Sequence, residues 1–186
     1  VSTLNNRSAV ELAADLDQLD ACQEAREWTR GKTLAEAWAL CERMDWMLWL
    51  TRRKCDRGTV VLATCACARL AMAHAPPGEE RSRRAVDVAE RWTRGEATLE
   101  EVQAATRAAS YAAFDATRAD DYTAFDATRA DDYTAAAAAA LALAAGYGAF
   151  DATRADDYTT GAAEFATMTA LKDMADIVRS LVTVGP

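Results

Sequence analysis

The chain has 186 residues, about half of them hydrophobic with alanine supplying much of that share, and its formal net charge is −8 at pH 7. This length suits a single domain with a core of ordinary size. The acidic balance argues against nucleic acid as the main partner, because phosphate binding needs an excess of Lys and Arg on one face.

The ends of the chain and its apolar stretches indicate a cytoplasmic protein. The opening segment is too polar for a signal peptide, and the alanine-rich run at residues 135–146 is too short and too weakly hydrophobic to cross a bilayer. The five cysteines are odd in number and suggest no disulfide scaffold, so we expect reduced thiols and no contact with a membrane.

Helix signals begin near the N-terminus and continue through the first half. Capping boxes, in which Ser or Thr precedes Glu by three residues, predict helix starts at Ser8, Thr33 and Thr98. We expect Asp20 to cap a helix over residues 21–30 that Gly31 ends, and Asp45 to cap one over residues 46–54.

The segment at residues 59–75 is apolar on nearly all sides, which is typical of a central buried helix. Asp56 and Gly58 are expected to break the chain before it, and the Pro-Pro-Gly at residues 76–78 to stop it. Residues 79–94 follow as an amphipathic helix closed by Gly95. Its inward side chains are expected to be Val86, Ala89 and Trp92.

The second half is alanine-rich and contains an eleven-residue repeat. The sequence AFDATRADDYT occurs twice in tandem at residues 113–134 and again at residues 149–159. We expect a turn at Gly146 and Gly148, a helix from the third copy to about Gly161, and a last helix over residues 162–182.

These signals predict an all-α fold: one domain over residues 1–186 with about eight helices and no strand. We expect a helical body at 8–110, the alanine-rich segment at 111–160 and a closing part at 161–186.

The repeat has a period close to three helical turns, so successive copies nearly superpose on a helix. Within one copy, Phe114, Arg118 and Tyr122 follow at i, i+4 and i+8, which can place the Arg between two rings. The small residues Ala116, Ala119 and Thr123 lie on the opposite side. A solvated helix that packs through its small face and a recognition surface are both compatible with this pattern.

The aromatic and charged positions of the three copies are the candidate interface. They are Phe114, Arg118, Asp121, Tyr122, Phe125, Arg129, Asp132, Tyr133, Phe150, Arg154, Asp157 and Tyr158.

Catalytic and metal-binding patterns are not predicted. His74 stands alone, and Cys65 and Cys67 would point to different sides of a helix, so neither suggests a metal site. The paired Asp residues of the repeats lack the glycine and alternating oxygens of a calcium loop. With neither a phosphate loop nor a nucleophile elbow, we expect no cofactor, no metal and no enzyme activity.

Three stretches, at residues 21–50, 63–102 and 175–182, resemble a family of all-α bacterial immunity proteins encoded in polymorphic-toxin and prophage neighbourhoods. The strongest parts are GEERSRRAVDVAERWTRGE and the closing DIVR, and that family carries a variable Ala, Tyr and Asp repeat where AFDATRADDYT lies here. The family-like stretches include Trp46 and Trp49, for which core packing is favoured over partner contact. They also include Arg83 and Arg84, for which a solvated or salt-bridged role is favoured.

The resemblance implies a protein that neutralises a cognate toxin by direct binding without catalysis. The acidic surface of the chain favours a basic partner. Two alternatives stay open. One is a structural protein that self-associates through the repeat helix, and the other is a phage or bacterial protein that sequesters a small ligand among its helices.

Overall fold

The computed structural model describes residues 2–73, 80–119, 140–165 and 168–185, and within them no side chains of residues 112–119, 152, 164, 165 and 168. The described residues form ten helices and one small two-stranded sheet, so the predicted all-α class is confirmed with more helices than expected. The helices are α1 (Ala9–Gln18), α2 (Gln23–Thr29), α3 (Leu34–Leu40), α4 (Met44–Lys54), α5 (Arg57–Ala73), α6 (Glu80–Thr93), α7 (Leu99–Ala119), residues 140–148, α9 (Ala152–Phe165) and α10 (Met168–Leu181).

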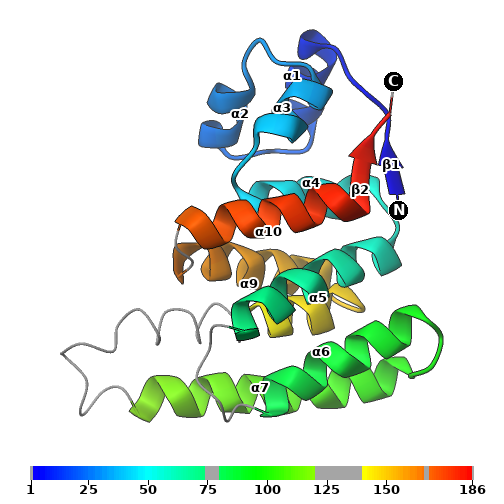
Figure 1. Cartoon of the computed structure of the whole chain (residues 1–186), viewed down its shortest axis with the longest axis vertical. Coiled ribbons are helices and arrows are strands. Elements are labelled where there is room, and N and C mark those ends of the chain that lie inside the picture. Colours follow the sequence, from blue (N-terminus) through cyan, green and yellow to red (C-terminus); the bar gives the residue numbers. More distant parts are fainter. Residues whose placement is uncertain (1, 74–79, 120–139, 166–167, 186) are drawn as a thin grey trace.

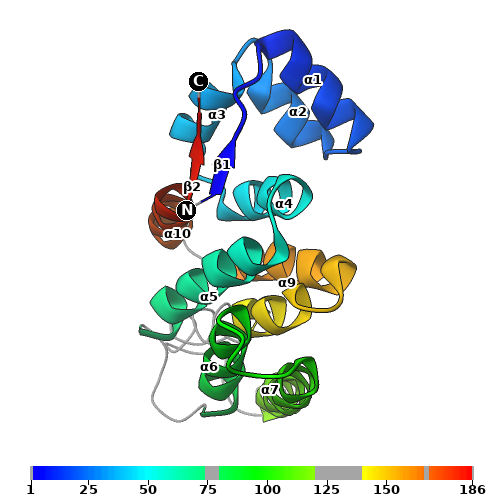
Figure 2. The ribbon, with the colours of Figure 1, turned by 90° about the vertical axis from the view of Figure 1, so that its right-hand side faces the viewer.

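The helices stack in layers along the long axis of the molecule (Figures 1 and 2). Helices α1, α2 and α3 form a lobe at one end, with α4 and α10 beneath it. Helices α5 and α9 lie in the middle, and α6 and α7 form the opposite end. The lobe therefore contacts the rest of the molecule mainly through the layer that contains α4.

Three helix starts follow the predicted capping boxes. The Ser8 and Thr33 side chains accept from the backbone N–H of Glu11 and Glu36, and each Glu reaches back to its cap. Glu101 N–H donates to Thr98 Oγ1 at 3.2 Å, and Thr98 N–H donates to the Glu101 carboxylate at 2.7 Å. These signals are local, so the rest of the fold does not override them.

Two predicted caps were wrong. Helix α2 begins after Cys22, and Asp20 instead adopts a left-handed backbone with φ 55° in the turn after α1. Helix α4 begins after Arg43, which places Asp45 within the first turn. There its carboxylate is buried against the guanidinium of Arg43, two residues earlier in the chain, so a local ion pair takes the place of the expected cap.

Helix α5 is the expected central helix. Its start was predicted two residues late, because Asp56 caps it by accepting from Thr59 N–H at 2.9 Å and Gly58 lies inside it. Its side chains fill the core; those buried are Val60, Val61, Ala63, Thr64, Cys65, Cys67, Ala68, Ala71 and Met72. In α6, Val86 and Ala89 are buried as expected, and Trp92 is half-buried.

The turn expected at Gly146 and Gly148 was wrong. Both residues are helical, and the turn follows at residues 149–150. A Cβ on Gly146 would lie 3.0 Å from Thr106 Cβ of α7, so this glycine allows two helices to approach closely. The expected closing helix is also divided, with α9 ending at Phe165 and α10 starting at Met168.

The expectation of no strand was wrong. Strands β1 (Ser2–Leu4) and β2 (Val182–Val184) pair in parallel, with Thr3 opposite Thr183. Each strand has only three residues, too few for an alternating pattern to be recognised in the sequence. The pair brings the two ends of the chain side by side (Figure 1).

Candidate binding cavity

A cavity of about 460 Å³ lies between the α1–α3 lobe and α4. Its wall is apolar and aromatic, with charged groups at a few positions. The lining consists of Leu12, Leu16, Asp20, Ala21, Cys22, Glu24, Ala25, Trp28, Thr29, Leu34, Ala37, Trp38, Cys41, Arg43, Asp45, Trp46, Met47, Trp49, Leu50 and Thr160. Its size falls in the range of ligand-binding pockets, roughly 300–1,000 Å³.

Four of the five tryptophans line this cavity. Trp28 comes from α2 and Trp38 from α3. Trp46 and Trp49 are one turn apart on α4, so both reach the same side of that helix. Trp46 and Trp49 are half-buried rather than enclosed in the core, and the indoles of Trp28 and Trp46 meet with centroids 5.9 Å apart.

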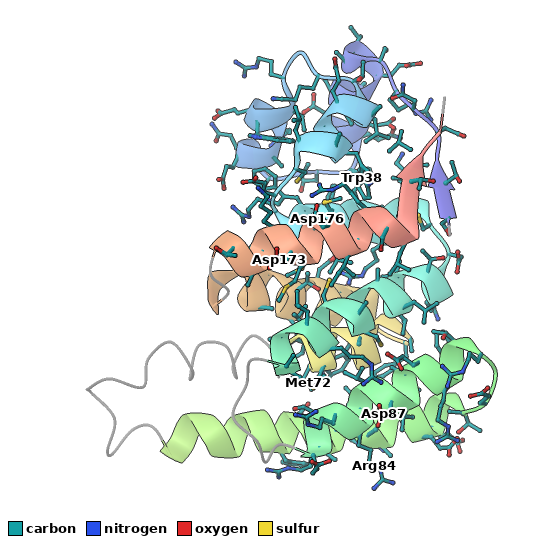
Figure 3. The ribbon with its side chains drawn as sticks, in the orientation of Figure 1. Trp38, Met72, Arg84, Asp87, Asp173 and Asp176 are labelled. Atoms are coloured by element: carbon teal, nitrogen blue, oxygen red, sulfur yellow. The ribbon has the colours of Figure 1, made fainter. Side chains whose placement is uncertain are left out.

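Trp38 joins the cavity wall to the sheet. Its Nε1–H donates to the Val182 carbonyl of β2 at 3.0 Å, in a buried position where an indole needs a partner. Figure 3 shows Trp38 between the lobe and α10. The bond fixes one face of the cavity relative to the two ends of the chain.

Three of the cavity tryptophans carry a cation on one ring face. Lys32 Nζ lies 4.5 Å from the ring centroid of Trp28, and the guanidinium carbons of Arg43 and Arg53 lie 4.7 and 3.9 Å from those of Trp46 and Trp49. Such contacts contribute about 0.5–1 kcal/mol each at exposed sites. They hold the indoles in fixed orientations around the cavity.

Arg43 and Asp45 form the main polar contact of the wall. Arg43 donates to both oxygens of Asp45, at 2.9 and 2.8 Å, and lies 3.6 Å from the more exposed Glu24 carboxylate. The hydrogen bond with Asp45 raises the pKa of Arg43 above its ordinary value. The charge of Asp45 is therefore compensated inside the wall.

Arg179 of α10 positions the C-terminal end of α3. Its Nη1 donates to the carbonyls of Trp38 and Cys41, at 3.1 and 2.6 Å, and its Nη2 pairs with Asp176 at 2.5 Å. A cation at a helix C-terminus satisfies carbonyls that have no partner within the helix. Arg179 is the Arg of the closing DIVR, so this family-like motif supports the cavity wall.

The third repeat copy lies outside this cavity and packs around Tyr147. Tyr158 stacks on Tyr147 with centroids 5.3 Å apart and planes 8° apart, and Phe150 meets the same ring at 5.2 Å. Arg154 lies 5.4 Å from the Tyr147 centroid and donates to its hydroxyl at 3.2 Å. The Arg was expected between Phe150 and Tyr158, but its ring partner is a tyrosine that precedes the copy.

The remaining positions of the third copy divide by face. Ala155 and Thr159 are buried, as expected for the small face, whereas Arg154 and Asp157 are exposed. Arg154 pairs with Asp151 at 3.6 Å. The aromatic residues of this copy thus contribute to the protein's own packing.

The first two copies lie mostly outside the described residues. Phe114 and Arg118 are on the backbone of α7, but their side chains are not described. The candidates Asp121, Tyr122, Phe125, Arg129, Asp132 and Tyr133 fall outside the described residues, as does His74.

Sequence reasoning missed the role of Asp156. Its carboxylate pairs with Arg52, whose side chain is only 6% exposed, and with Arg53 at 3.2 Å. Burial lowers the pKa of Arg52 below its ordinary value. The sequence did hold a signal for this ion pair. Asp156 is next to Ala155 on the small, inward side of the predicted helix, where a carboxylate needs a cationic partner.

The five cysteines differ in how deeply they are buried. Cys65 and Cys67 are buried as expected, and burial raises the pKa of both thiols, that of Cys67 to about 12. Cys41 is buried in the cavity wall, Cys55 is half-buried, and Cys22 is exposed. No group of three metal-ligating side chains occurs among the described residues.

Arg83 and Arg84 are exposed on α6, at the opposite end of the molecule from Trp38 (Figure 3). They are therefore remote from the cavity. Of the helices in the described ranges, none has the length and apolar character needed to cross a membrane.

Comparisons with known proteins gave no match. No family model, no curated protein and no solved structure matched this chain.

Proposed function

We propose that this protein works by binding, without catalysis, and that the tryptophan-lined cavity receives an apolar group of its partner. The observation that carries the proposal is the cavity itself, with four indoles around about 460 Å³. Tryptophan dominates binding energy where it forms a pocket that excludes water. The cations on three of the rings and the hydrogen bond of Trp38 hold the pocket in its open form before a partner arrives.

The partner that we propose is a cognate toxin, which makes the chain an immunity protein acting in the cytoplasm. Support comes from the position of the family-like stretch at residues 21–50. All lining residues belong to it except Leu12, Leu16, Asp20 and Thr160. The closing DIVR contributes Arg179, which holds α3 in place. Two of the three stretches that resemble immunity proteins, residues 21–50 and 175–182, therefore build and support the cavity, whereas residues 63–102 contribute no lining residue.

The test is co-expression with the protein encoded by the adjacent gene. We expect that protein to arrest growth alone, and the wild-type chain to restore growth and to co-purify with it. Ala25→Trp adds an indole to the cavity wall and should abolish both effects. Ala39→Trp, on the exposed side of α3, is the matched control and should keep both. Rescue by Ala25→Trp at the wild-type level would refute use of the cavity, and a harmless neighbour would refute the toxin.

A small ligand is the second candidate, favoured by the volume of the cavity. A thermal-shift screen against nucleotides and metabolites tests it. Stabilisation of the wild-type chain but not of Ala25→Trp would support it, and the absence of any stabilising compound would count against it.

Self-association through the repeat helix is the remaining alternative. Light scattering after size-exclusion chromatography tests it with a chain lacking residues 113–123. An oligomer that dissociates on this deletion would support self-association, and a monomer unchanged by the deletion would exclude it.

A further inference from the structure

We propose that the cavity selects an apolar side chain that lies next to a positive charge on the partner, so that the partner segment is basic. This inference rests on the proposed binding function and adds the chemistry of the group that is bound. It follows from the charges of the cavity lining.

The lining contains three carboxylates and one guanidinium. Asp45 is neutralised by Arg43 through two hydrogen bonds. Glu24 lies 3.6 Å from the same guanidinium, which already serves Asp45, and the Glu24 side chain is 71% exposed. Asp20 is exposed and makes no ion pair with any residue that the structure describes. Two carboxylates are thus available to a ligand.

The other nearby cations do not neutralise the excess negative charge of the cavity lining. Arg53 stacks on the Trp49 ring and pairs with Asp156. Lys32 lies over the Trp28 ring, and its ammonium donates to the Trp28 carbonyl. Neither residue is part of the cavity lining. The whole chain carries a net charge of −8, so its overall field also favours a cation.

Asp20 follows the C-cap of α1, where helices commonly end on a left-handed residue: its N–H donates to the Asp17 carbonyl at 3.2 Å, and Ala21 N–H donates to the Leu16 carbonyl at 2.9 Å. The Asp20 φ of 55° is in the left-handed region, which side chains other than Gly rarely adopt and which Asp and Asn tolerate best. Glycine would form the turn after α1 with less strain, but it would leave the mouth of the cavity without this carboxylate.

Aromatic rings add to the preference for a cation. An indole face attracts a positive charge, and the described cations on Trp28, Trp46 and Trp49 demonstrate this attraction within the same wall. A bulky apolar group fills the cavity, and an adjacent ammonium or guanidinium can reach Asp20 and Glu24 at its mouth.

Three cyclohexyl probes of matched shape test the inference: cyclohexylmethylamine, cyclohexylmethanol and cyclohexanecarboxylate. None absorbs where tryptophan does, so a change in tryptophan emission, to which four cavity indoles and Trp92 contribute, reports binding, and ligand-observed NMR checks it. At pH 7 we expect the amine to bind best and the carboxylate worst. Each available carboxylate should favour the amine over the alcohol by about two- to five-fold, the effect of an exposed ion pair.

The double variant Asp20→Asn/Glu24→Gln should bring the amine to the affinity of the alcohol and leave the alcohol unchanged. Asn keeps the tolerance of the left-handed backbone, so the turn is preserved. Asp17→Asn, a surface carboxylate of α1 paired with Arg26 outside the cavity lining, is the matched control and should change nothing.

The possible outcomes separate this inference from the proposed function. Equal binding of all three probes, or amine selectivity that survives in the double variant, would overturn the charge selection while leaving the cavity as a binding site. Binding of none would overturn the inference, and the co-expression test would still decide the toxin. Fragments of this size should bind in the millimolar range. Micromolar binding of the amine would assign the cavity to a free small cation instead.

Discussion

Arg52 of α4 and Asp156 of α9 form an ion pair between two neighbouring helices, and the Arg52 side chain is almost completely buried. Two nitrogens of this guanidinium, Nε and Nη2, have no hydrogen-bond partner among the residues that the structure describes. Asp156 is consequently the main compensation for a charge that has lost most of its water.

Asp156→Asn should therefore destabilise the fold by about 3 kcal/mol, because removing one partner leaves a buried charge uncompensated. Urea unfolding followed by circular dichroism measures the change. Asp157→Asn, one residue further on the exposed side of α9, should alter the free energy of unfolding by less than about 0.5 kcal/mol. Equal effects of the two substitutions would contradict a special role for the buried pair.

Gly146→Ala should destabilise the protein by about 1–3 kcal/mol, because the new Cβ would lie 3.0 Å from Thr106 Cβ and 3.1 Å from its Cγ2. Gly161→Ala is the control, since its Cβ would meet no described atom within 4 Å. There α9 should gain about 1 kcal/mol from the better helix former. Adding Thr106→Ala to Gly146→Ala should recover part of the loss. A double variant no better than the sum of its parts would exclude a steric cause.

The capping glutamates should make stability depend on pH in the acidic range. Hydrogen bonds from Ser8, Thr33 and Thr98 lower the pKa of Glu11, Glu36 and Glu101 below the ordinary value of 4.5. Their contribution is present above pH 4.5 and is lost as pH falls through the lower pKa of the folded state.

The triple variant Glu11→Gln/Glu36→Gln/Glu101→Gln keeps a capping partner for each helix but no titrating group. Its free energy of unfolding should fall less than that of the wild type between pH 6 and pH 3, a pH range that spans the ordinary value near 4.5. Parallel curves for the two proteins would refute the assignment of this pH dependence to the caps.

Iodoacetamide should modify Cys22 first in the folded protein. Cys22 is exposed, whereas burial raises the pKa of Cys41, Cys65 and Cys67 and so leaves little reactive thiolate. Intact-mass spectrometry should show one fast addition, which Cys22→Ser removes. Because Cys22 also lines the cavity, a bulky maleimide on it should weaken binding of the cyclohexyl probes. Fast labelling that persists in Cys22→Ser would contradict this assignment.

The sequence predicted those features of the fold that depend on neighbouring residues. The capping boxes and the buried faces of α5 and α6 are of this kind. Asp20 and Asp45 were assigned wrongly although their contacts are also local: Asp20 follows the C-cap of α1, and Asp45 pairs with Arg43 two residues earlier. The cavity could not be predicted, because its wall depends on how the lobe is placed on α4.

The repeat shows the same limit within one chain. The seven residues AFDATRA are continuous helix at 113–119 in α7, but at 149–155 they form a turn and then the first residues of α9. In the third copy, the Tyr147 carbonyl accepts from Phe150 N–H at 2.9 Å, and Asp151 accepts from Arg154 N–H at 3.2 Å. The same seven-residue sequence thus takes different structures at its two positions in the chain.

The bond between Trp38 and Val182 joins residues 144 positions apart in the chain. Contacts of such separation form late, because a long loop must close before they contribute. During synthesis, the lobe and most of the cavity wall leave the ribosome long before residue 182. The cavity wall thus gains its hydrogen bond to β2 only after residue 182 has emerged.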